Sequence, residues 1–246
     1  MAVATFKLTV EYDGSEFAGW QRQADQPTIQ AALEQALLRM SQHPTPLVGA
    51  GRTDAGVHAL GQVASFRSDK SFTPEEWRRG LNALVPESIC VRTVERVADD
   101  FHARYSAKGK LYEYRLLNRE ERTALDRTRM WHLQRPLDVT LMQEAAQFLL
   151  GRHDCSSFQG PQSDVDNRVC DIREVTVRRN DDIFSITIYA DRFLKQMVRA
   201  IVGTLVEVGL RKRSPTSMNE ILAARDRCLA GRTAPAHGLY LVRVDY

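Results

Sequence analysis

Long hydrophobic runs, paired cysteines and a leader-like opening are all missing from this sequence. The longest apolar runs, such as Met197 to Val202, are far too short to cross a bilayer. The four cysteines are widely spaced, and none belongs to a C-x-x-C pair or lies near a histidine at metal-ligand spacing, so we expect reduced, mostly buried thiols. The chain opens without a basic segment followed by an apolar stretch, which predicts no secretory signal and a cytoplasmic protein.

Several motifs that define common enzyme classes are also missing. No G-x-S-x-G turn occurs, which argues against a Ser/His/Asp hydrolase. Neither G-x-x-x-x-G-K-[ST] nor G-x-G-x-x-G is present, so nucleotide cofactors lack support. No low-complexity or Ser/Pro/Gly-rich run interrupts the chain, and a flexible linker between domains is not required.

Lysine is scarce and arginine is abundant. The chain has 6 lysines and 28 arginines with a net charge of only +3, so charge alone argues weakly for a polyanionic partner. The guanidinium group of arginine suits phosphates and base edges, although a GC-rich genome would also raise its frequency. With 246 residues, 43% of them hydrophobic, the chain can form a sizeable core in one large domain or two small ones.

Hydrophobic periodicity indicates two similar halves of mixed helices and strands. In the first half, Thr28 and Thr73 are placed to cap amphipathic helices. The expected order there is strand 5–12, helix 29–41, strand 47–51, strand 62–66, helix 74–85 and strand 89–97. The second half is expected to contain strands 111–117, 169–178, 183–190 and 239–244, and helices 139–150, 194–209 and 215–229.

These patterns predict an α+β fold with an antiparallel sheet and helices on one face. We expect one domain at 1–106, with a Gly-rich loop, and another at 107–246, with a tyrosine-bearing strand and an arginine-bearing helix. The polar loop from Ser156 to Asn167 is expected to be mobile.

The densest cluster of candidate residues is the loop GAGRTDAGVH at 49–58, where glycines place Arg52 and Asp54 close to the backbone. Taken alone, Asp54 could be a turn residue and Arg52 a solvated surface charge. A metal site formed by Asp54, His58 and His102 matches no known ligand spacing, so both histidines are expected to be structural hydrogen-bonding residues.

Two further features stand out in the second half. In KGKLYEYR, alternation puts Tyr112 and Tyr114 on one face of a strand, where they could stack on a nucleotide base or simply pack in the sheet. Arg199 lies within the apolar helix FLKQMVRAIVG, where a charge is costly unless it is paired. It lies either at the polar edge of the helix or beside a carboxylate, for which Asp54 is a candidate.

Taken together, the motifs resemble the TruA family of tRNA pseudouridine synthases. The resemblance rests on EYDGSEFAGWQRQ, GRTDAGVHA, FHARYSAKGK, KLYEYR, FLKQMVRAIVG and APAHGLYLVRVDY, which occur in the family's order and span nearly the whole chain. It implies two ferredoxin-like or RRM-like halves with merged sheets and an active cleft between them. It also implies isomerisation of uridine at positions 38, 39 and 40 of the tRNA anticodon stem-loop, and a homodimer in which one tRNA contacts both subunits. No cofactor and no metal are implied.

The resemblance also implies roles for individual residues. Asp54 is the expected nucleophile, and Arg199 is expected to pair with it. Tyr112 is expected to stack on the extruded base and to assist proton transfer, while Arg52 occupies the space that the base vacates and holds phosphate. Leu239 is expected to pack against the base from another side. Two alternatives stay open, a non-catalytic RRM-like RNA-binding protein and a pseudouridine synthase that acts on another RNA. Attack of Asp54 on C1′, attack on the pyrimidine ring and a glycal path also stay open.

Overall fold

A computed structural model describes residues 3–161 and 166–246 of the chain, which form two compact units. Unit 1 consists of the chain up to Lys108 together with Tyr240–Tyr246, and unit 2 consists of Gly109–Leu239. The division lies close to the expected boundary after residue 106, but the last strand belongs by its contacts to unit 1. Residues 162–165, part of the loop that we expect to be mobile, lie outside the described residues.

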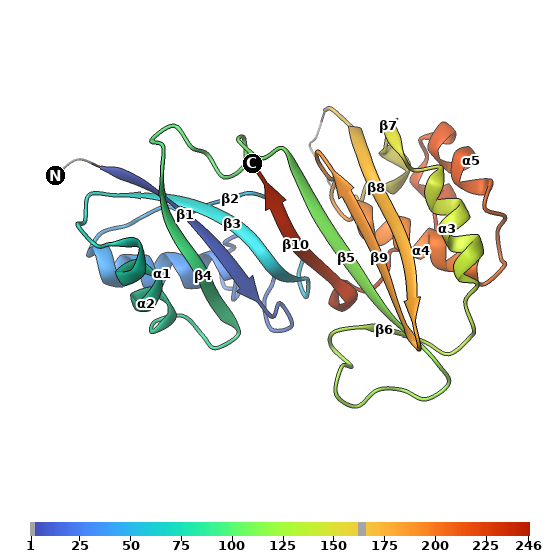
Figure 1. Cartoon of the computed structure of the whole chain (residues 1–246), viewed down its shortest axis with the longest axis horizontal. Coiled ribbons are helices and arrows are strands. Elements are labelled where there is room, and N and C mark those ends of the chain that lie inside the picture. The colour runs from blue at the N-terminus through green and yellow to red at the C-terminus, as the bar shows by residue number, and fades with distance from the viewer. Residues whose placement is uncertain (1–2, 162–165) are drawn as a thin grey trace. The chain divides into compact units, whose positions relative to one another are not determined.

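Unit 1 is built on a twisted sheet in which the strands lie in the order β4-β1-β3-β10, with the short β2 beside β3 (Figure 1). Its strands are β1 (Ala4–Tyr12), β2 (Val48–Gly49), β3 (His58–Ser68), β4 (Ile89–Val97) and β10 (Leu239–Asp245). β1 pairs with β3 and with β4 in antiparallel fashion.

The strand pairs are antiparallel, as predicted, except at two places. β10 runs parallel to β3 in unit 1, and β6 runs parallel to β5 in unit 2. A parallel pair needs a long connection between its strands, and the chain between β3 and β10 is long enough to supply one. Alternation within a strand shows which side chains share a face, but it holds no information on the direction of the neighbouring strand. The α+β class itself is confirmed.

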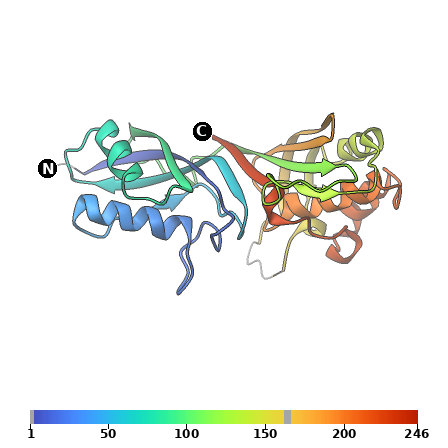
Figure 2. The ribbon, with the colours of Figure 1, turned by 90° about the horizontal axis from the view of Figure 1, so that it is seen from below.

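The two helices of unit 1 are α1 (Ile29–Ser41) and α2 (Pro74–Asn82), and they begin at the predicted caps. The hydroxyl of Thr28 accepts a hydrogen bond from the Ala31 amide, and Thr73 forms a capping box with Glu76. Figure 2 shows α1 along one face of the sheet of unit 1, where its apolar side chains are buried.

Unit 2 has a sheet in the order β5-β9-β8-β7, with β6 beside β5. Its strands are β5 (Gly109–Asn118), β6 (Trp131–Leu133), β7 (Gly151–Asp154), β8 (Val169–Asn180) and β9 (Ile183–Ala190). Its helices are α3 (Val139–Gln147), α4 (Met197–Gly209) and α5 (Ser217–Ala224), with short 3₁₀ turns at Ser156–Phe158, Arg227–Leu229 and Ala236–Gly238.

Three features of unit 2 differ from the sequence prediction. β6 and β7 were missed because strands of three and four residues are too short to show alternation. Helix α4 begins at Met197 rather than at residue 194, because Gln196 has a left-handed φ of 59° and the Lys195 carbonyl accepts a hydrogen bond from the Gly160 amide. The last predicted helix is shorter and ends at Ala224, after which Arg225 is left-handed.

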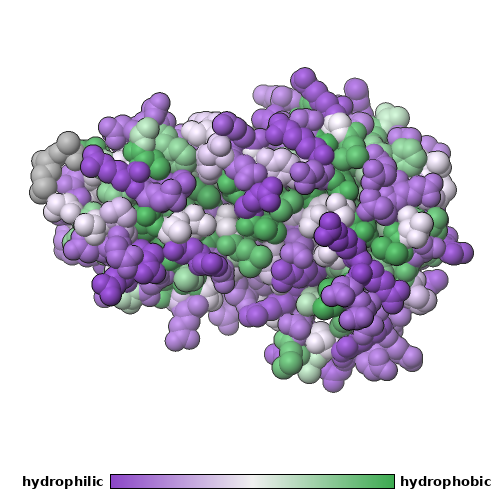
Figure 3. Space-filling model, viewed as in Figure 1, coloured by the Kyte–Doolittle hydropathy of each residue, from purple (hydrophilic) through white to green (hydrophobic). Residues whose placement is uncertain are grey.

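The surface of both units is mainly polar on the face shown in Figure 3, with apolar side chains in small groups between the hydrophilic ones. Leu125, in the loop before β6, is the most exposed large apolar side chain of the described residues, at 91%. Across residues 3–161 and 166–246, no helix combines the length and the apolar character that a membrane crossing requires.

Candidate active site

The loop with Arg52 and Asp54 connects β2 to β3 in unit 1. Arg52 is exposed, and Asp54 is partly buried. The Asp54 carbonyl accepts a hydrogen bond from the Val57 amide at 3.1 Å, and Gly56 in between has a φ of 75°, so the residues after Asp54 form a tight turn. The backbone that follows Asp54 is therefore fixed locally.

A second loop, which follows β1 and contains the motif EYDGSEFAGW, is packed against the first. The Trp20 amide donates to the Thr53 carbonyl at 3.1 Å, and the Gly56 amide donates to the Phe17 carbonyl at 3.3 Å. Gly19 has a φ of 103°, and a β-carbon on it would lie 2.6 Å from the Thr53 carbonyl oxygen. Two sequence motifs that are far apart along the chain thus form one interlocked structure.

His58 anchors this structure from the start of β3. Its ring is buried, and its Nδ1 accepts a hydrogen bond from the Gly14 amide at 3.1 Å. The carboxylate of Asp13 lies 3.2 Å from the same nitrogen, but that oxygen already accepts bonds from the amide and the hydroxyl of Ser15. The ring also stacks on Tyr240 with centroids 4.8 Å apart.

His102 has a similar structural role in unit 1. Its Nδ1 accepts from the amides of Arg104 and Tyr105, both at 3.2 Å. Within the described ranges 3–161 and 166–246, no three His, Cys, Asp or Glu side chains are grouped closely enough to hold a metal ion.

Arg199 lies in the first turn of α4 in unit 2, partly buried between the buried residues Val198 and Ala200. Its Nε donates to the Ala234 carbonyl at 2.7 Å, and its own carbonyl accepts from the Ala234 amide at 3.0 Å. The guanidinium is therefore held by a direct side-chain bond to the segment before β10. This bond also satisfies the buried Ala234 carbonyl.

The two tyrosines on β5 lie on one face, as predicted, and both are buried. Tyr114 is a packing residue, because its hydroxyl donates to the Pro235 carbonyl at 2.7 Å and its ring leaves no room for a side chain at Gly238. Burial raises the pKa of the Tyr114 phenol well above its usual range, and the nearby Arg199 opposes this only in part. Tyr112 is 7% exposed and meets the Phe193 ring edge to face, with centroids 4.9 Å apart.

Leu239 follows the 3₁₀ turn Ala236–Gly238 and is buried. The segment that leads to it thus contacts both α4, through Ala234, and β5, through Pro235. This segment belongs to the APAHGLY motif, in which Tyr114 leaves no room for a side chain at Gly238.

The structure therefore places Arg52 and Asp54 in one loop of unit 1, and Tyr112 and Arg199 on β5 and α4 of unit 2. Leu239 is the last residue of unit 2, where β10 begins. The ion pair between Asp54 and Arg199 would join the two units and stays a prediction. Two residues that the sequence reasoning missed, Tyr12 and Gln62, are hydrogen-bonded beside the Asp54 loop. The sequence signal for Gln62 is a long amide within the apolar strand HALGQVASF.

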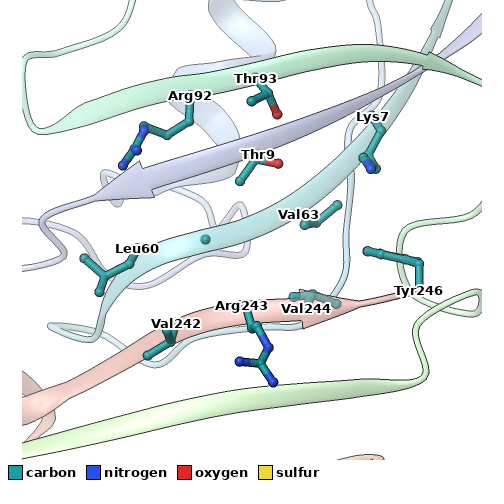
Figure 4. Close-up of a pocket in the computed structure, with 11 residues that line it drawn as sticks. Lys7, Thr9, Leu60, Val63, Arg92, Thr93, Val242, Arg243, Val244 and Tyr246 are labelled. Carbon is teal, nitrogen blue, oxygen red and sulfur yellow. The ribbon is translucent and has the colours of Figure 1, made fainter.

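A shallow pocket lies on the strand face of unit 1 that Figure 4 shows, and none of the expected site residues lines it. Its cations are Lys7, Arg92 and Arg243, and each is ion-paired with a carboxylate. The pocket therefore offers polar side chains that are already neutralised, and its chemistry does not indicate a catalytic site.

Comparison with known proteins identifies the class of protein to which this chain belongs. The sequence pattern of the tRNA pseudouridine synthase family matches residues 8–106 and 145–246, which is most of the chain. The chain belongs to this family, whose members are isomerases.

Named relatives agree over nearly the full length. The chain is 44% identical over 240 residues to tRNA pseudouridine synthase A of Acetivibrio thermocellus, covering 98% of each sequence. It is 45% identical over 243 residues to tRNA pseudouridine synthase A of Wolbachia pipientis subsp. Culex pipiens, covering 98% of this chain and 99% of the relative. The protein of the same name from Pectobacterium atrosepticum is 44% identical over 239 residues, covering 97% of this chain and 84% of that protein.

Proposed function

We propose that this chain isomerises uridine to pseudouridine in the anticodon stem-loop of tRNA, at positions 38, 39 and 40, in the cytoplasm. The observation that supports this most strongly is the GRTDAGVH loop, which is held rigidly by a second motif of the same family. In this reaction the bond from N1 to C1′ breaks, the base turns, and C5 bonds to C1′ while the proton on C5 leaves and N1 gains one. Substrate and product contain the same atoms at the same oxidation level, so no redox cofactor is needed.

Asp54 is the proposed nucleophile. A carboxylate can form a covalent bond to carbon or stabilise positive charge that develops at the sugar, as in glycoside hydrolysis. The fixed backbone around Asp54 supports this role, because a group that reacts with an extruded nucleotide must be held in place before the nucleotide arrives. Attack on the sugar, attack on the ring and a glycal path are all compatible with a carboxylate at this position.

Arg199 is proposed to pair with Asp54 and to keep it ionised in a cleft that excludes water. Burial would raise the pKa of a carboxylate, and an adjacent guanidinium would lower it. The support is the hydrogen bond from Nε to the Ala234 carbonyl, which fixes one edge of the guanidinium.

The remaining roles concern the extruded base. A stacked uridine is taken out of its helix at a cost of a few kcal/mol, which the enzyme must offset. We propose that Arg52 fills the vacated space and contacts phosphate, which its exposure on the loop supports. Tyr112 is proposed to stack on the base and assist proton transfer, and Leu239 to pack against the base from another side. Tyr112 lies on β5 beside Tyr114, whose hydroxyl donates to the Pro235 carbonyl. Leu239 follows the segment in which the Ala234 carbonyl accepts a hydrogen bond from Arg199.

The decisive experiment incubates the purified protein with tRNA transcripts and locates pseudouridine by chemical derivatisation and sequencing. We expect modification in the anticodon stem-loop by the parent protein and none with Asp54→Asn. Binding without modification would instead identify a non-catalytic RNA-binding protein. Modification of other cellular RNA, with the anticodon stem-loop left unmodified, would identify a synthase with a different substrate.

We also propose a homodimer in which both subunits contact one tRNA, on the strength of the sequence resemblance. Light scattering of the purified protein measures its molar mass, which should be that of two chains. The molar mass of a single chain would contradict the homodimer. Because arginines are expected to meet the phosphates, tRNA binding should weaken as salt rises. A dissociation constant that does not change with salt would contradict this electrostatic contribution.

A further inference from the structure

A buried hydrogen-bond network lies directly beneath the Asp54 loop. The Tyr12 hydroxyl at the end of β1 lies 2.7 Å from the Thr53 hydroxyl. The Gln62 amide on β3 donates to the Gly51 carbonyl at 2.9 Å and, more weakly, to the Tyr12 oxygen at 3.5 Å. The network thus contacts the backbone of Gly51 and the side chain of Thr53, the two residues that flank Arg52 and lead into Asp54.

These polar groups lie where apolar side chains would suffice for packing. Gln62 is fully buried at 0% exposure, and Tyr12 and Thr53 are nearly so. A buried amide or hydroxyl costs free energy unless it is hydrogen-bonded, and here the bonds go to the loop. The Gly51 carbonyl needs a donor, which fixes the orientation of the Gln62 amide, and the other end of that amide accepts from the Val63 backbone at 3.2 Å. A phenylalanine and a methionine would fill the same volume without these bonds.

The strands are also adapted to this arrangement. The pairing of β1 with β3 shifts between Val10, opposite Gln62, and Tyr12, opposite Ala59, so the strands contain a bulge at this point. Bulges re-aim side chains and occur often beside active sites. Burial raises the pKa of the Tyr12 phenol far above its usual range, so the hydroxyl keeps its proton at any working pH and can donate it.

We propose that Tyr12 and Gln62 are positioning residues, which fix the Gly51–Thr53 backbone and thereby the orientation of the Asp54 carboxylate. This inference rests on the proposed function of Asp54. Neither side chain is proposed to touch RNA. Their removal should therefore slow the chemical step while tRNA binding is kept, because small misplacements of a reacting group cost up to about 100-fold in rate.

The test compares variants that remove one hydroxyl or amide without changing the packing volume. Tyr12→Phe and Gln62→Met remove the donors, Thr53→Val removes the hydroxyl between them and Asp54, and Thr53→Ser keeps it. Tyr246→Phe is the matched control, because it removes a phenol bond to the Ala103 carbonyl, 2.8 Å long, elsewhere in the same unit. Single-turnover rates at saturating tRNA, dissociation constants and Tm are measured for each.

We expect Tyr12→Phe, Gln62→Met and Thr53→Val to lower the single-turnover rate by about 10- to 100-fold with tRNA affinity nearly unchanged. Thr53→Ser and Tyr246→Phe should retain the parental rate. The double variant Tyr12→Phe with Thr53→Val should be no slower than the worse single variant, because both break the same bond. A Tyr12→Phe rate equal to that of Tyr246→Phe, at equal Tm, would overturn the positioning role. A parent protein that makes no pseudouridine would overturn the proposed function instead.

Discussion

The two candidate charges, Asp54 in unit 1 and Arg199 in unit 2, are held in different ways. Asp54 is fixed through its backbone, by the bonds of Thr53, Gly56 and Val57 to the chain around them. Arg199 is fixed through its own side chain, by the bond from Nε to the Ala234 carbonyl. Substitutions near Asp54 should therefore act on the carboxylate indirectly, whereas substitution of Arg199 itself removes both the charge and the bond that places it.

The largest effect should come from Asp54→Asn, which keeps the shape of the side chain and removes its charge. If the carboxylate is the nucleophile, turnover should fall by roughly 10⁴-fold or more. Because the loop is held through its backbone, Tm and tRNA affinity should stay close to those of the parent. Single-turnover assays measure the rate, and calorimetry measures Tm and tRNA affinity. A variant that converts uridine at the parental rate would refute the proposed role of Asp54.

Arg199→Lys should show a different combination, in which stability falls as well as turnover. Lysine keeps the positive charge but cannot hold the Ala234 carbonyl and face a carboxylate at once. We expect turnover to fall by about 100-fold or more. The free energy of unfolding should fall by about 1–3 kcal/mol, because a buried carbonyl loses its partner. Arg199→Leu is the companion variant that removes the charge, and near-normal turnover with normal folding in Arg199→Leu would reject the ion pair with Asp54.

The neighbouring tyrosines of β5 sharpen the comparison within unit 2. Tyr112→Phe should keep tRNA binding and slow turnover by about 10-fold or more, as expected when a proton-transfer group is lost. Tyr114→Phe should mainly lower Tm, because it removes the hydrogen bond to the Pro235 carbonyl, and such a bond contributes about 1 kcal/mol to the free energy of unfolding. Turnover rates and thermal unfolding of both variants show which tyrosine acts in catalysis and which in stability. Loss of folding by Tyr112→Phe would show that Tyr112 is a purely structural residue.

A smaller effect is expected from Gly19→Ala, compared with Gly151→Ala in unit 2. The two glycines have nearly equal φ values, 103° and 102°. An added β-carbon would meet the Thr53 carbonyl at Gly19 but only the His153 ring, 3.7 Å away, at Gly151. Both variants should lose about 1–3 kcal/mol of stability from strain. Only Gly19→Ala should also slow turnover several-fold, and equal rates in the two variants would show that the loop after β1 does not position Asp54.

Much of the fold could be predicted because its signals are local. The caps of α1 and α2 and the strands at 89–97 and 183–190 follow from residue type and periodicity, and the structure has them where they were expected. The parallel pairing of β10 with β3 could not be predicted, since it depends on where the chain returns after unit 2.

The candidate site shows the same limit at the level of single residues. Asp54 and Arg52 stood out because glycines surround them, and Arg199 because its neighbours are apolar. Tyr12 resembled an ordinary strand residue, and Gln62 an isolated polar one. Their proximity to Gly51 and Thr53 arises only when β1 and β3 pair around a bulge.

The smallest expected effect compares two helix caps, Asp138 at α3 in unit 2 and Thr28 at α1 in unit 1. Hydrogen bonds from the Leu141 and Thr140 amides and the Arg211 guanidinium hold the pKa of Asp138 below its usual range. A depressed pKa in the folded state stabilises the fold above the unfolded pKa, and this contribution is lost as pH falls through the folded pKa.

Asp138→Asn keeps an oxygen for the cap but removes the charge. Its Tm should therefore lie slightly below that of the parent at pH 7, and the difference should vanish at pH values well below about 3.9, the ordinary pKa of aspartate. The hydroxyl of Thr28 is neutral, so the Tm deficit of Thr28→Ala should be the same at both pH values. An Asp138→Asn deficit that persists unchanged in acid would mean that shape, and not charge, makes the aspartate the better cap.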